Sequence, residues 1–137
     1  IKKGVSEEEA NQRISKANLA FPDALVQNYQ GLINQLALPD KDDCHVLAAA
    51  IKANADLIVT NNIKDFPKEY LQSFSLLAKT ADDFLTDIIE LNQELALAAF
   101  KEMVLNKKNP KQDEFKVLKL LRNAGLQDTA SQLHALL

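Results

Sequence analysis

Apolar residues at helical spacing follow a capping sequence near the start of the chain. In SEEEANQRISKANLAF, residues 6–21, the Ser6 side chain can accept from the backbone N–H of Glu9 while Glu9 reaches back to Ser6. One apolar stripe follows at helical spacing: Ala10, Ile14, Ala17 and Phe21. The pattern predicts a helix that ends before Pro22.

The next segment, residues 22–40, has a short apolar opening and then a weaker helical pattern. Its apolar residues recur at helical spacing only in the second half: Tyr29, Leu32, Ile33 and Leu36. We expect a short strand or extended turn here, followed by a short helix.

A helix that leads directly into a strand is predicted in the middle of the chain. The helical apolar face is formed by Val46, Leu47, Ala50 and Ile51. DLIVT, residues 56–60, is short and β-branched, as expected for a strand buried on both faces of a parallel sheet. A helix followed by such a strand is half of an α/β repeat. NNIKDFP, residues 61–67, is then the loop at the carboxyl end of this strand, where α/β sheets bind ligands.

Helical patterns dominate the remainder of the chain. SFSLLA, residues 73–78, predicts a second strand. Thr80 and Asp83 form a capping pair ahead of one helix, and Asn92 caps the next. A polar linker at 107–111 and a helical hairpin with Gly125 as its left-handed stop complete the pattern. The sequence predicts an α/β part over residues 1–90 and an all-helical extension over 91–137.

Composition favours a soluble domain and excludes several kinds of site. Of the 137 residues, 47% are hydrophobic and 26% charged, which allows a normal core. No apolar run approaches a membrane span or a signal peptide. Cys44 is the single cysteine and indicates a reducing, cytoplasmic setting, while His45 and His134 are the only histidines. A cysteine–histidine zinc site, a catalytic triad and a glycine-rich phosphate loop all lack the residues they need.

Basic side chains are concentrated in one stretch although the net charge is −3. Residues 101–122 contain seven lysines and arginines against three acidic residues. This excess is compatible with a phosphate-binding patch, but the solvated faces of amphipathic helices are the favoured interpretation. The spacing alone does not separate the two interpretations.

Four aspartates flank the central helix and strand. Asp40, Asp42 and Asp43 precede the helix, and Asp65 follows the strand. One aspartate at a helix start is explained by capping, but three within four residues repel one another and exceed that need. Carboxylates at a helix start and at the end of the adjacent strand can converge on a hard divalent ion such as Mg²⁺ or Mn²⁺. Capping with solvated loop charges, and a metal site, are the two hypotheses.

The stretch LPDKDDCHVLAAAIKANADLIVTNNIKDFP, residues 38–67, resembles the second half of a PIN domain in the branch of VapC-like ribonucleases with a helical C-terminal extension. FPDALV upstream and DDFL with the terminal GL…T…L…LL helix downstream are also similar to that branch. The resemblance implies a PIN-like α/β fold and a Mg²⁺- or Mn²⁺-dependent endoribonuclease, often the toxin of a toxin–antitoxin pair. Its implied partners are RNA and an antitoxin protein. A second copy of the chain is a further candidate partner through strand exchange, and the absence of a long apolar run argues against a membrane partner.

The resemblance also implies roles for individual residues. Asp43 matches the acidic ligand at the helix start, and Asp40 a second acid just before it. Thr60, Asn62 and Asp65 occupy the polar end of the strand and the last acidic position. The implied catalytic residues are Asp43 and Asp65, and the implied metal ligands are these two with Asp40 and Asn62. Asn62 departs from relatives that have aspartate there, and its neutral carbonyl would bind a cation more weakly.

Part of the expected domain precedes the first residue. PIN domains begin with a strand that ends in an essential aspartate, followed by helices that supply a glutamate, whereas this chain starts at IKKGVSEEEANQR without methionine. We therefore expect it to be the C-terminal two-thirds of a longer protein, and to be inactive or weakly active alone. The alternative is a non-catalytic α/β remnant that acts through protein contacts, by pairing a sheet edge or by exchanging strands. An antitoxin-like regulatory protein is supported only by the helical tail.

Overall fold

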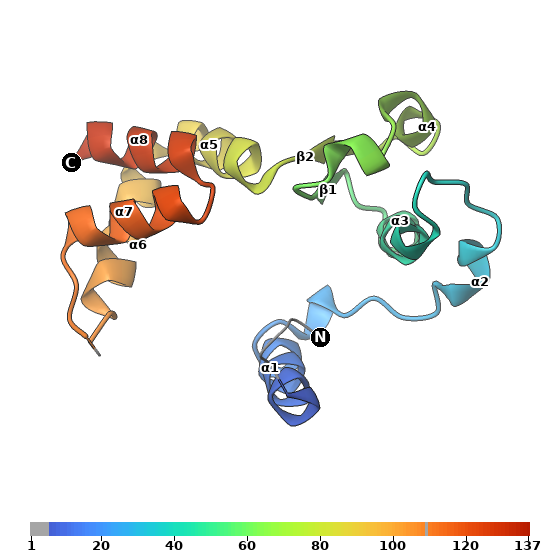
Figure 1. The fold of residues 1–137 in the computed structure, drawn as a ribbon, viewed down its shortest axis with the longest axis horizontal. Helices are drawn as coiled ribbons and strands as arrows, with labels where there is room; N and C mark the ends of the chain where they lie inside the picture. The colour runs from blue at the N-terminus through green and yellow to red at the C-terminus, as the bar shows by residue number, and fades with distance from the viewer. Residues whose placement is uncertain (1–5, 109) are drawn as a thin grey trace. The chain divides into compact units, whose positions relative to one another are not determined.

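Figure 1 shows the helices and strands of the described chain, which divide into two compact units. The computed structural model describes residues 6–108 and 110–137; one unit extends to Asp56 and the other begins at Leu57. Helices predominate, with a small parallel sheet, and the C-terminal part is helical. The predicted PIN-like α/β class with a helical extension is therefore confirmed. Within the described ranges, no helix is both long enough and apolar enough to cross a bilayer.

The first unit opens with α1, Glu7–Ala20, where the capping prediction is confirmed. The Ser6 hydroxyl accepts a hydrogen bond from the Glu9 N–H at 3.1 Å. The predicted apolar stripe is exposed instead of buried, since Ile14 is 57% and Phe21 68% accessible. A 3₁₀ turn at Pro22–Ala24 replaces the alternative of a strand.

The rest of this unit is built around α3, Cys44–Lys52, which packs against the short helix α2, Gln30–Ile33. Leu47 and Ala48 are fully buried. The Cys44 thiol, 3% exposed, donates to the Leu36 carbonyl at 3.7 Å, so this cysteine is a packed residue of the helix start. These contacts hold the N-terminal end of α3, where the aspartates lie.

The second unit begins with the parallel pair β1, Leu57–Val59, and β2, Leu77–Lys79. Ile58 lies opposite Ala78 in the register and is 5% exposed, whereas Val59 is 45% exposed. Burial on both faces was therefore the wrong expectation for Val59. Among the described residues the sheet has two strands, which is too small a surface to bury every side chain.

Between these strands the chain forms a 3₁₀ turn at Ile63–Asp65 and the short helix α4, Lys68–Gln72. The second strand starts later than predicted because residues 73–75 end α4. The Ser73 hydroxyl donates to the Tyr70 carbonyl at 2.6 Å, and Ser75 adopts a left-handed φ of 58°. Serine bonded to the nearby backbone favours such a turn over a strand.

Four helices complete the second unit: α5 (Ala81–Leu91), α6 (Gln93–Leu105), α7 (Glu114–Asn123) and α8 (Gln127–Leu136). They enclose a core of buried side chains: Ile89, Phe100, Val104, Val117, Leu118, Ala130 and Leu133. The predicted caps are present, with Thr80 on α5 and Asn92 on α6. Gly125, at φ 92°, makes the predicted left-handed turn between α7 and α8.

A carboxylate from another helix caps α8. Leu126 stands at the N-cap position and has no side-chain acceptor, which leaves the first N–H groups without a local partner. Asp82, in the first turn of α5, accepts from the N–H of Asp128 at 3.0 Å and from that of Thr129 at 2.8 Å. The Thr129 hydroxyl donates to the same carboxylate at 2.6 Å. Asp82 thereby fixes the start of α8 against α5.

We expect Asp82→Ala to lower the free energy of unfolding by about 1–3 kcal/mol, because it removes the acceptor of three hydrogen bonds. Urea denaturation followed by circular dichroism measures this loss. Asp83→Ala is the matched control, since Asp83 is an exposed aspartate in the same turn. Equal losses in the two variants would contradict the capping role.

The same carboxylate predicts an acid-dependent loss of stability. Burial alone would raise the pKa of Asp82, but the bonds from Thr129 and Asp128 outweigh it and hold the pKa below its usual value. The stability that the ionised Asp82 carboxylate contributes is therefore complete above its unfolded-state pKa. It is lost as the pH falls through the folded-state pKa. We expect the urea concentration at the unfolding midpoint to decrease when the pH is lowered below about 4. The midpoint of Asp82→Asn, which has no carboxylate there, should depend less steeply on pH in this range.

Candidate functional site

The acidic cluster of the first unit lies on the turn that leads into α3. Residues Lys41–Asp43 form a 3₁₀ turn, and the Asp40 carboxylate accepts from the N–H of Asp42 at 2.9 Å. One of the four aspartates thus has the local capping role that was the simpler hypothesis. The turn places Asp43 directly before Cys44, the first residue of α3.

Asp43 lies where a negative charge is favourable. It occupies the N-cap position of α3 without forming a side-chain cap, and it is half-buried. The partial positive charge of a helix N-terminus stabilises an ionised carboxylate at this point. The neighbouring His45 is exposed, and its Nδ1 contacts the backbone carbonyl of Asp42. His45 is therefore engaged locally with the backbone of the acidic turn.

The polar loop of the second unit brings Thr60, Asn62 and Asp65 into one turn after β1. The Thr60 N–H donates to the Lys79 carbonyl at 2.8 Å, which extends the pairing with β2 by one residue. The Thr60 hydroxyl accepts from the Asn62 N–H at 3.0 Å, and the Asn62 carbonyl accepts from the Asp65 N–H at 2.9 Å. This chain of short-range bonds holds the loop directly at the end of the strand.

A cavity of about 470 Å³ adjoins this loop. Its lining combines three lysines, Lys64, Lys68 and Lys79, with apolar groups that include Phe66 and Leu77. Lys79 is ion-paired with Asp87, and this partner raises the pKa of the lysine. Sequence reasoning missed this cavity, because nothing in the spacing of Lys64, Lys68 and Lys79 shows that they surround one space.

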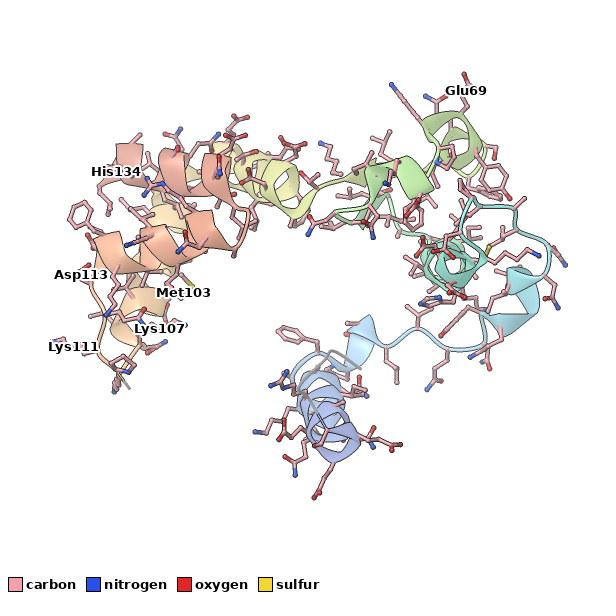
Figure 2. All side chains as sticks on the ribbon, in the orientation of Figure 1. Glu69, Met103, Lys107, Lys111, Asp113 and His134 are labelled. Atoms are coloured by element: carbon pink, nitrogen blue, oxygen red, sulfur yellow. The ribbon has the colours of Figure 1, made fainter. Side chains whose placement is uncertain are left out.

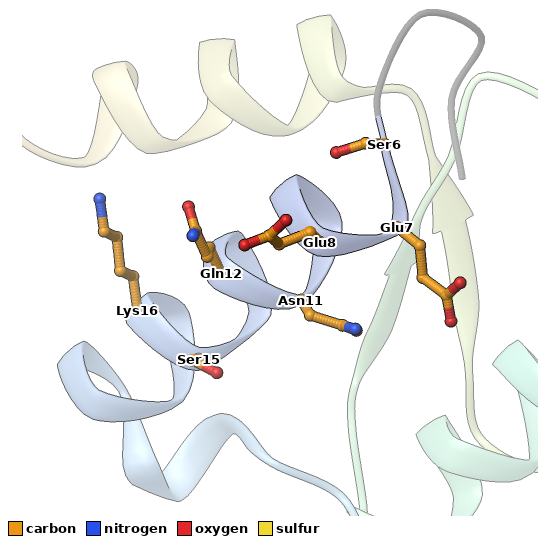
Figure 3. A pocket seen from close by; sticks show the side chains of 7 residues that line it. All are labelled: Ser6, Glu7, Glu8, Asn11, Gln12, Ser15 and Lys16. Atoms are coloured by element: carbon orange, nitrogen blue, oxygen red, sulfur yellow. The ribbon is translucent and has the colours of Figure 1, made fainter.

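A wider hollow on α1 does not bring together polar groups from several elements, as a binding site requires. Figure 3 shows its lining, which consists of side chains from α1 and its cap: Ser6, Glu7, Glu8, Asn11, Gln12, Ser15 and Lys16. Ligand pockets are concave and close polar groups from several directions around one point. A lining drawn from one helix face does not do this, so we assign no site there.

The oxygen donors of the aspartate segments suit a hard divalent cation. Asp40 and Asp43 belong to the first unit, and Asn62 and Asp65 to the second. Carboxylate and amide oxygens are the ligands that Mg²⁺ and Mn²⁺ prefer. Over residues 6–108 and 110–137, no three His, Cys, Asp or Glu side chains gather at one point. The donor chemistry fits such an ion, and each unit by itself supplies two of the four expected donors.

Two family matches cover most of the chain. Residues 1–64 match the PIN domain family, and residues 81–135 match the family described as the VapC50 C-terminal domain. The first match contains Asp40, Asp43, Thr60 and Asn62, and the second corresponds to the helices from α5 to α8. The resemblance to VapC-like PIN proteins with a helical C-terminal extension is thereby confirmed.

A curated relative points to the same family. The protein named "Putative ribonuclease VapC50", from Mycobacterium tuberculosis (strain ATCC 25618 / H37Rv), is 44% identical to this chain over 62 residues. These residues are 45% of this chain and 37% of the relative, so the match spans little more than a third of the relative's length. No solved structure matches the chain.

We expect Thr60→Val to loosen the polar loop, because valine keeps the volume of threonine but cannot accept from the Asn62 N–H. The free energy of unfolding should fall by about 0.5–1.5 kcal/mol. Amide hydrogen exchange at Asn62 measures the local effect and should become faster. Thr60→Ser retains the acceptor and is the control. Unchanged exchange in the valine variant would show that this bond does not order the loop.

Proposed function

We propose that the protein containing this chain is a metal-dependent endoribonuclease of the PIN type that acts as the toxin of a toxin–antitoxin pair. The match of residues 1–64 to the PIN domain family is the observation that carries this proposal. The relative named as a ribonuclease supports it. Residues 1–90 form the catalytic α/β domain in this proposal, and residues 91–137 the helical extension.

The aspartates hold the catalytic ion in the proposed enzyme. Asp43 and Asp65 act as the catalytic carboxylates and bind Mg²⁺ or Mn²⁺ together with Asp40 and the amide oxygen of Asn62. Thr60 orders the loop through its bond to the Asn62 N–H. A bound divalent ion lowers the pKa of water and offsets negative charge on a phosphodiester.

The reaction is hydrolysis of RNA. A water oxygen forms a bond to phosphorus, one P–O ester bond breaks, and the departing oxygen takes up a proton. The side chains of this chain would position the reacting phosphate and stabilise its charge. We propose no covalent route, because the sequence offers no clear pair of nucleophile and base. Asn62 contributes a neutral donor, so the set carries less negative charge than four carboxylates.

The partners follow from this chemistry. RNA is the substrate, an antitoxin protein is the inhibitor, and a second copy of the chain is the candidate partner for a homodimer. We place the protein in the cytoplasm, because RNA is present there and because a single cysteine is typical of proteins in a reducing compartment.

The test is cleavage of a fluorescent RNA by the protein in its natural length, with Mg²⁺ or Mn²⁺ supplied. We expect Asp43→Asn to lower turnover by about a hundredfold or more, since it removes a charge that acts on the transition state without changing the side chain's volume. Asp65→Asn should act in the same direction, and a chelator should abolish cleavage.

Asp42→Asn is the matched control, because Asp42 is a neighbouring exposed aspartate outside the proposed ligand set. It should retain most of the turnover. Full activity of Asp43→Asn, with the fold verified by circular dichroism, would overturn the proposed role of Asp43. Activity that persists in the chelator would overturn the metal dependence.

A further inference from the structure

A second lysine-lined cavity lies in the helical part of the second unit, where α6 ends and the chain turns toward α7. It has a volume of about 350 Å³ and is lined by Val104, Leu105, Lys107, Lys108, Lys111 and Gln112. Figure 2 labels Lys107 and Lys111, whose side chains project from this end of the helices. The volume lies within the range of small-ligand sites.

The three lysines of this cavity carry uncompensated charge. Among the described residues the ion pair is that of Lys79 with Asp87, so none of the three is paired with a carboxylate. The nearest acidic residue after the turn, Asp113, uses its carboxylate to cap α7 by accepting from the Lys116 N–H at 2.8 Å. Three positive charges therefore face one space without a partner of opposite sign.

The backbone increases this concentration of charge. Lys108 and Lys111 form an isolated antiparallel bridge, which places them directly opposite each other. Side chains of opposed residues lie on the same face, and like charges in such a pair repel. A bound anion between the two ammonium groups removes this repulsion, whereas a turn needed only for chain reversal has no requirement for two lysines.

The remaining lining fits the other parts of a nucleotide. Gln112 lines the same cavity, and its side-chain oxygen is buried without a hydrogen-bond partner among the described residues. Val104 and Leu105 supply apolar surface beside it. The cavity thus presents cations for phosphates, one polar side chain and an apolar wall.

We propose that the cavity of Lys107, Lys108, Lys111 and Gln112 binds the phosphate backbone of single-stranded RNA. The proposal rests on the proposed ribonuclease function and gives the helical extension the task of holding substrate. RNA is favoured over an acidic protein because it supplies closely spaced phosphates for the opposed Lys108 and Lys111 and bases for the apolar wall. The contact is to the backbone, so it serves RNA of many sequences.

The test is fluorescence anisotropy of labelled single-stranded RNA, about 16 nucleotides long, titrated with the 137-residue chain. A chelator is present throughout, so that binding is measured without cleavage. The variant carries Lys107→Gln, Lys108→Gln and Lys111→Gln. We expect its affinity to fall at least about tenfold in low salt, and the slope of log affinity against log salt to decrease by about two, from about 0.7 for each lost phosphate contact.

A matched control changes three other exposed lysines of α6 and α7: Lys101→Gln, Lys116→Gln and Lys119→Gln. It removes the same formal charge from the two helices that flank the cavity segment and changes none of the cavity lining. We expect a much smaller loss and a nearly unchanged slope. Equal losses in the two triple variants would overturn the proposal in favour of a diffuse effect of charged helix faces.

Two further outcomes would overturn the RNA-binding proposal. The first is that the unchanged chain does not bind RNA. The second is that the cavity variant binds RNA as before but loses affinity for an acidic protein. This test is independent of the aspartates and of the metal ion. If cleavage fails to depend on Asp43 but the cavity variant loses RNA affinity, the proposed catalytic role fails and the binding site stands. If the reverse is observed, the catalytic proposal stands and the binding site fails.

Discussion

The geometry of the helical part depends on the carboxylate of Asp82 in α5, which accepts hydrogen bonds from the first N–H groups of another helix, α8. Asp82 accepts from the N–H groups of Asp128 and Thr129, which α8 cannot satisfy with Leu126 at its own N-cap position. Because Asp82 lies one residue after the start of α5, the bond also fixes α8 relative to the segment that follows β2. The buried residues Ala130 and Leu133 of α8 are thereby held in the common core.

The candidate catalytic groups are fixed in a different manner, by short-range bonds within each segment. Asp40 caps the turn that leads into α3, and the Thr60 hydroxyl orders the loop after β1. Such bonds cost little chain entropy, since they join residues two positions apart. They fix the acidic turn before α3 and the polar loop after β1 separately, each within its own unit.

In the proposed enzyme, the acidic segments and the lysine-rich segment have different roles. Aspartates at the start of α3 and after β1 suit a divalent ion, which in the proposed enzyme would offset negative charge on the phosphodiester. Lysines at the turn after α6 suit the backbone of the same substrate. The net charge of −3 does not oppose the proposed RNA binding at this turn, because seven of the 16 lysines and arginines lie in residues 101–122. Affinity and chemistry can then be altered independently.

The sequence by itself determined the local features: the caps by Ser6, Thr80 and Asn92, and the left-handed turn at Gly125. Each depends on residues within a few positions, so periodicity and residue type suffice. The Asp113 cap follows the same rule and was overlooked. The tertiary structure decided that α1 exposes its apolar stripe, that Asp82 caps a helix some 47 positions away, and that Gln112 joins three lysines around one cavity. A repeating pattern shows which face of a helix is apolar, but only packing selects the partner of that face.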